Sequence, residues 1–75
     1  MQKDALTIFH VKELVGERRE VVLRARSRSD SVDLVARALG VARDDVVDAD
    51  RFVIVEVNYG DDFLAGGPRG IIAIF

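Results

Sequence analysis

The sequence contains no cysteine, which excludes disulfide bonds, thiolate metal ligands and thiol nucleophiles. No apolar run approaches the roughly 20 residues that a membrane-spanning helix needs, and the opening Met-Gln-Lys-Asp lacks the apolar core of a secretion signal. We therefore expect a cytoplasmic protein with no membrane partner. The sequence also lacks a P-loop, a GxGxxG motif, an HExxH motif and a nucleophile elbow. We expect no enzymatic activity of the chain itself, and neither a cofactor nor a metal.

The composition is that of a small folded protein, because 49% of the 75 residues are apolar, 32% are charged and only one is proline. A chain of this length forms a single domain, residues 1–75, and buries only about 60% of the surface of its unfolded form. Its charge is uneven. Residues 12–28 hold six basic and three acidic side chains, whereas residues 44–62 hold seven acidic side chains and Arg51 alone. The asymmetry predicts a basic end and an acidic end.

The first half of the chain predicts a β-hairpin followed by a helix. Residues 5–12 are rich in β-branched and aromatic side chains and partly apolar on both faces, which suits a central strand, and Gly16 lies among charges in a reversal. From Val21 onward apolar and polar side chains alternate, which predicts a second strand with one buried and one wet face. Residues 29–31 are good N-cap residues, and apolar side chains then recur at helical spacing as far as Gly40.

The second half predicts two more strands. Residues 52–59 are apolar at nearly every position, and residues 71–75 form a shorter apolar strand after a turn that contains Pro68. Residues 41–50 are mixed and acidic, and either a short helical turn or a loop fits them. The resulting order predicts an α+β fold of the β-grasp, or ubiquitin-like, kind: a ββαββ mixed sheet with one main helix packed on one face and the last strand parallel to the first. A different ββαββ arrangement is the alternative.

Four segments resemble the MoaD/ThiS group of small sulfur-carrier proteins of the ubiquitin-like superfamily. Phe9-His-Val-Lys-Glu-Leu-Val-Gly-Glu-Arg-Arg-Glu-Val-Val-Leu23 is similar to the first hairpin of that group. Residues 31–39 are similar to its first helix, residues 55–58 to its third strand and residues 71–75 to its last strand. The resemblance implies a protein that docks on a partner, such as an adenylating enzyme or a larger synthase subunit.

The resemblance breaks at the C-terminal tail. In that group the chain ends in Gly-Gly, whose carboxylate is adenylated and converted to a thiocarboxylate, whereas the present sequence stops at Phe75. Its only diglycine, Gly66-Gly67, is internal and precedes a proline, which predicts a turn. A sulfur-carrier function therefore requires a Gly-Gly tail beyond Phe75. Without such a tail we expect a ubiquitin-like domain that works by docking alone.

Three arginines make the strongest candidate binding surface. Arg24, Arg26 and Arg28 alternate along the second predicted strand, which would place them on its solvent face roughly 7 Å apart. Such a ladder could bind the carboxylates of an acidic protein or the phosphates of a nucleic acid, and the ordinary alternative is a solvated face. A pI of 5.2 disfavours nucleic acid. We assign Phe75 in the last strand to the same hypothetical partner surface.

The sole histidine and the acidic residues are the remaining candidates for a functional role. His10 is the sole histidine and has no nucleophile beside it in a motif, so we expect a structural or surface role. The acidic residues lack the spacing of an EF-hand and predict a solvated acidic edge, which could also bind the arginines of a second copy. They are Asp44, Asp45, Asp48, Asp50, Asp61 and Asp62. Three functions stay open: a docking protein of the sulfur-carrier type, a binding module that uses the arginine face, and a self-assembling interaction domain.

Overall fold

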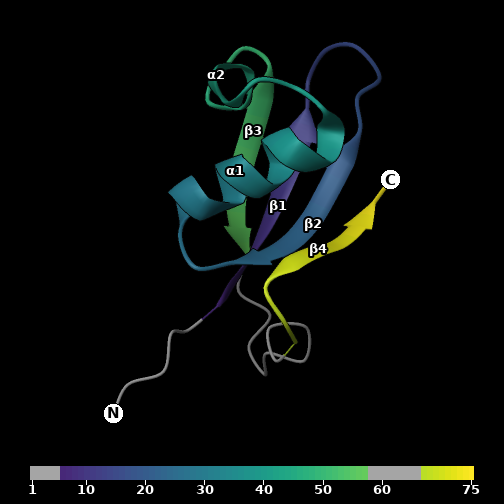
Figure 1. Ribbon diagram of the computed structural model, residues 1–75. Coiled ribbons are helices and arrows are strands. Elements are labelled where there is room, and N and C mark those ends of the chain that lie inside the picture. Colours follow the sequence, from purple (N-terminus) through teal and green to yellow (C-terminus); the bar gives the residue numbers. More distant parts are fainter. Residues whose placement is uncertain (1–5, 58–66) are drawn as a thin grey trace.

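The structure is a computed structural model that describes residues 6–57 and 67–75. One α-helix lies across one face of a four-stranded sheet (Figure 1), so the predicted α+β class with a main helix on one face is confirmed. In chain order the elements are β1 (Thr7–Glu13), β2 (Glu20–Ala25), α1 (Arg28–Leu39), α2 (Arg43–Val46), β3 (Phe52–Val57) and β4 (Gly70–Ile74). In the described part of the chain, no helix has the length and apolar character needed to cross a membrane.

The first two strands form the predicted hairpin. They are antiparallel, with Phe9 opposite Leu23 and Val11 opposite Val21, and all four side chains are buried. The turn between them contains Gly16 at a φ of 73°, a backbone conformation that favours glycine. The alternation of apolar and polar residues in β2 therefore sets which face of the sheet enters the core.

The sheet has the strand order β3-β1-β2-β4, and each of its neighbouring pairs is antiparallel. This arrangement corrects the expected mixed sheet, because β4 pairs with β2 and does not lie beside β1. Both edges of β1 are already occupied, by β2 on one side and by β3 on the other. The central position predicted for the first strand is thus confirmed, but the place that the β-grasp plan gives to the last strand is taken by β3.

The helix α1 begins earlier than its sequence pattern predicts. Its N-cap is Ser27, whose hydroxyl oxygen accepts a hydrogen bond from the backbone N–H of Asp30 at 3.1 Å. Because β2 ends at Ala25 and α1 starts at Arg28, the expected continuation of the strand through Arg28 is wrong. The predicted end is confirmed: Gly40 caps the helix in the left-handed conformation, with a φ of 71°.

The core lies between α1 and the sheet and also receives α2. For residues 41–50 the sequence allowed either a helical turn or a loop, and the structure has the four-residue helix α2 there. The side chain of Val46 in α2 is only 1% exposed. Predicted features at Asn58, Tyr59 and Gly66 lie outside the described residues. The buried cluster consists of Phe9, Val11, Val21, Leu23, Ala25, Val32, Val35, Val46 and Phe52.

Candidate functional site

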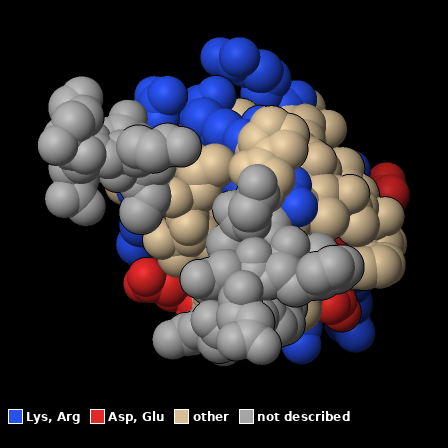
Figure 2. All heavy atoms as spheres, turned by 90° about the horizontal axis from the view of Figure 1, so that it is seen from below, with Lys and Arg blue, Asp and Glu red and all other residues tan. Residues whose placement is uncertain are grey.

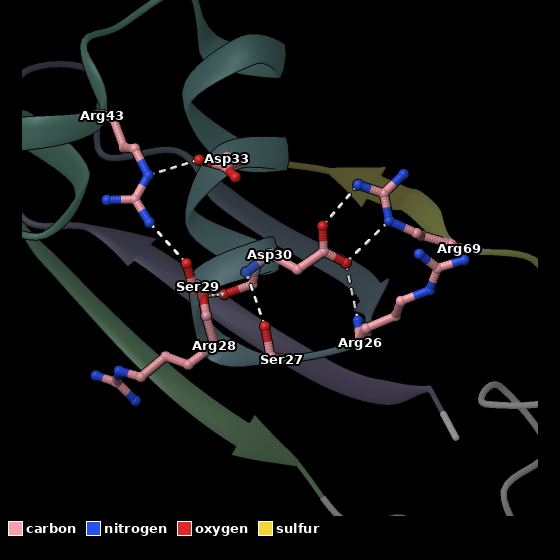
Figure 3. Close-up of polar contacts among 9 residues, drawn as sticks. Arg26, Ser27, Arg28, Ser29, Asp30, Asp33, Arg43 and Arg69 are labelled. Atoms are coloured by element: carbon pink, nitrogen blue, oxygen red, sulfur yellow. Dashed lines mark hydrogen bonds and ion pairs between the residues drawn. The ribbon is translucent and has the colours of Figure 1, made fainter. Parts of the chain in front are cut away.

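The three arginines predicted to form a ladder lie on different parts of the fold. Arg24 is in β2 between the buried Leu23 and Ala25, so its side chain points to the sheet face away from the core. Its guanidinium donates to the carbonyl of Pro68 at 3.4 Å. Arg26 follows the strand, and Arg28 is the first residue of α1 and points toward β3 (Figure 3). The predicted ladder is therefore wrong, and the surface proposed for nucleic acid loses its geometric basis.

A two-point ion pair holds the first turn of α1 to the start of β4. Arg69 donates to both carboxylate oxygens of Asp30, from Nε at 2.9 Å and from Nη2 at 2.6 Å. The backbone N–H of Arg26 donates to the same carboxylate at 2.9 Å (Figure 3). These hydrogen bonds, with that of the Arg69 side chain the largest, lower the pKa of Asp30 to about 2. Asp30 thus serves to join elements of the fold.

A second set of polar contacts fixes α2 against α1. Arg43 donates from Nε to Asp33 at 2.6 Å and from Nη2 to the hydroxyl of Ser29 at 2.8 Å (Figure 3). In the acidic segment, Arg51 donates to Asp45 at 2.9 Å. These exposed pairs contribute little to stability individually, but they orient α2 and they engage part of the predicted acidic edge.

Charges of both signs occur at the end of the molecule where β2 ends and β4 begins. Viewed from this end, the largest group of Lys and Arg side chains lies along one edge, and acidic side chains occur separately (Figure 2). The basic residues of segment 12–28 do not gather at one end, because Arg18 and Arg19 lie in the turn between β1 and β2 whereas Arg26 follows the other end of β2. Asp61 and Asp62, which belong to the predicted acidic end, lie outside the described residues. Within residues 6–57 and 67–75, no group of three potential metal ligands is close enough to hold an ion.

The sheet face away from α1 carries His10 and Phe75, and both lie beside Glu20 of β2. His10 contacts Glu20 on β2 through its Nε2 atom at 2.8 Å, and both side chains are partly exposed. Phe75 exchanges two backbone hydrogen bonds with Glu20, of 2.7 and 3.2 Å, and is 72% exposed. Cross-strand neighbours share a face, so Phe75 lies on the face opposite the helix. The structure therefore does not bring Phe75 together with Arg28.

A groove of about 580 Å³ lies between the start of α1, the helix α2 and the strand β3. We call it the α1–β3 groove. Its lining is mainly aliphatic, includes two arginines and contains no acidic residue. The residues that matter below are Arg28, Val32, Arg43, Val46, Val47 and Ile54.

Arg28 is the charged group of the groove that is least engaged. Its Nη1 atom donates to the backbone carbonyl of Ile54 on β3 at 3.3 Å, near the long end of the range for such bonds. Arg43, in contrast, is already held by Asp33. Among the described residues, no ion pair is found for Arg28. Its guanidinium can therefore bind a carboxylate or phosphate that enters the groove.

The sequence patterns did not reveal this groove, because three separate segments form it. The one local signal is the aliphatic pair Val46-Val47 within an otherwise acidic stretch. Val46 points into the core, whereas Val47 stays 54% exposed. An isolated apolar side chain in an acidic segment indicates packing against another element, but it does not say which one.

Comparison with known proteins does not place the chain in a family. No protein-family model matches it, and neither the curated proteins nor the solved structures include a significant match. The groove and the residues that line it are therefore the features from which we infer a function.

Proposed function

We propose that the chain is a non-catalytic binding domain that docks on a protein partner through the α1–β3 groove. The observation that carries this proposal is the combination of an aliphatic groove of about 580 Å³ with the weakly engaged guanidinium of Arg28 at its wall. Protein interfaces commonly combine an apolar centre with arginine, which is enriched at binding hot spots. Of the three functions that the sequence left open, this proposal keeps docking on a protein partner and places it at the groove and not at an arginine ladder.

An exposed aliphatic side chain in the groove supports docking. Val47 is 54% exposed, although it lies beside the core. Removing apolar surface from water is favourable by about 25 cal/mol per Å². A partner that covered the side chain of Val47 would gain this free energy without any rearrangement of the buried cluster.

The lowered pKa values of Glu13 and Asp30 support a role other than acid–base catalysis. Hydrogen bonds from Arg19 lower the pKa of Glu13, and those from Arg69 and Arg26 lower the pKa of Asp30. A general acid or base works best with a pKa near the working pH. Both carboxylates are shifted away from neutrality, and each is engaged in holding two parts of the fold together.

The sulfur-carrier role stays a separate proposal. The hairpin over residues 9–23 favours it, and the pairing of β4 with β2 disfavours it, because the β-grasp plan places the last strand beside the first. Mass spectrometry of the protein isolated from its own cells tests it, since a thiocarboxylate replaces one oxygen by sulfur. A C-terminus that does not end in Gly-Gly would contradict it.

The docking proposal is tested by affinity capture with two matched variants. Val47→Asp places a charge in the groove, and Ile74→Asp places one at the opposite edge of the sheet, where the side chain is 45% exposed. We expect quantitative mass spectrometry to show that Val47→Asp loses the partner of the wild-type chain and that Ile74→Asp keeps it. The reverse pattern would refute the proposal.

A further inference from the structure

The strand β3 has a free edge beside the groove. Among the described strands it pairs with β1 only. Just before β3, the N–H of Leu14 donates to the carbonyl of Arg51 at 2.7 Å, which fixes the phase of the antiparallel ladder. The odd-numbered residues of β3 therefore direct their backbone groups toward β1. Ile54 and Glu56 direct theirs toward the free edge.

The contact of Arg28 with β3 confirms that the backbone groups of Ile54 point toward the free edge, and it partly occupies that edge. This contact with the carbonyl of Ile54, at 3.3 Å, stands where the N–H of an added strand would donate. The contact is exposed and long, so a backbone N–H can replace it at little cost. The replacement would release the guanidinium of Arg28 to bind a carboxylate of the incoming segment.

The shape of the groove favours a single extended segment over a second copy of this chain. In Figure 1 the first turn of α1 projects past β3, so a strand added to β3 would run beneath it. A second copy joined at the same edge by a two-fold axis would bring its own helix start to the same place. A partner strand without such a helix avoids that collision.

We infer that the partner docks in the α1–β3 groove with an extended peptide segment, which adds to β3 as a further strand. This inference rests on the proposed function. The chemistry of the segment follows from the groove. An aliphatic side chain would pack on Val47 and Ile54, and an acidic side chain two positions away would bind Arg28. Residues i and i+2 of a strand share a face, so both side chains would point into the groove. Addition of a strand to a sheet edge is an established mode of peptide recognition.

The test uses a phage library of random eight-residue peptides, selected on the immobilised full chain. We expect the enriched peptides to share an aliphatic residue and an acidic residue two positions apart. For one enriched peptide, fluorescence anisotropy should show about tenfold weaker binding to Arg28→Gln and unchanged binding to Arg37→Gln, which alters an exposed arginine in the last turn of α1.

A second pair of variants tests the backbone contact. Glu56→Pro removes an N–H at the free edge but none of the bonds to β1, and Glu56→Ala is its matched control. We expect Glu56→Pro alone to abolish binding, and N-methylation of the peptide to abolish binding at alternate positions only. Thermal melting shows whether each variant is folded. If Glu56→Pro does not fold, binding of the N-methylated peptides to the wild-type chain tests the backbone contact in its place.

Three outcomes overturn the inference. Enriched peptides without an acidic residue would show that Arg28 does not bind the segment as inferred, and a methylation scan without alternation would show that no strand is added. In either case Val47→Asp could still lose the native partner, and the docking proposal would then stand. A library that yields no binder would also overturn it. Loss of the native partner on Ile74→Asp, with retention on Val47→Asp, would refute the docking proposal itself.

Discussion

Arg69 and Asp30 lie 39 residues apart in the sequence and form an ion pair at 2.6 Å, reinforced by a second hydrogen bond at 2.9 Å. The Asp30 side chain is 17% exposed, whereas that of Arg69 is 42% exposed. The pair fixes the start of β4 relative to the first turn of α1, and so stabilises the pairing of β4 with β2.

This pair predicts a pH-dependent stability. The folded-state pKa of Asp30 is lowered from 3.8 to about 2, so its contribution is fully present above the ordinary pKa and is lost as the pH falls toward 2. We expect Asp30→Asn to lower the free energy of unfolding at neutral pH by about 1–2 kcal/mol, allowing for solvent screening. Urea denaturation across the acid range measures it, and Asp44→Asn, at an exposed position, is the control. Equal acid sensitivity in Asp30→Asn and the wild type would contradict the prediction.

The N-cap of α1 predicts a second difference in stability. Ser27→Ala removes the acceptor for the N–H of Asp30 and should destabilise the protein by about 1 kcal/mol. Ser31 lies inside the helix, so it cannot take over this role. Thermal denaturation followed by circular dichroism measures the change, and Ser27→Asp, which keeps a capping acceptor, should preserve stability. A loss as large in Ser27→Asp as in Ser27→Ala would contradict the assignment of the cap.

The two adjacent valines of α2 and its C-cap should differ in their contribution to stability, because Val46 is buried in the core and Val47 is exposed in the groove. Val46→Ala removes two methyl groups from a side chain that is 1% exposed and should cost about 1–2 kcal/mol. Val47→Ala, at the neighbouring exposed position, should change stability by less than about 0.5 kcal/mol. Urea denaturation of the two variants compares them directly. Equal costs would indicate that α2 is not packed against the core.

Local patterns predicted the hairpin, the central place of the first strand and the end of the helix, because each depends on neighbouring residues. Gly16 and Gly40 lie at positive φ, as expected for a turn and a helix end. The alternation in β2 also identified the buried face correctly. Such features need no knowledge of which segments meet in space.

The remaining features depend on long-range pairing. The residues of β4 are uncharged and apolar, so their pattern could not say which strand they would pair with. The arginine ladder failed because Ser27 ends the extended segment and starts a helix, although the alternation itself continues to Arg28. The groove depends on the approach of α1, α2 and β3, which no single segment encodes.

Photocrosslinking in the native cells tests most directly whether a protein partner docks in the α1–β3 groove. A benzoyl-phenylalanine side chain placed at Val47 lies in the groove, and one at Ile74 lies at the opposite edge of the sheet. Irradiation should produce a covalent adduct between the partner and the chain labelled at position 47, and none at position 74. An adduct at position 74 with none at position 47 would contradict docking in the groove.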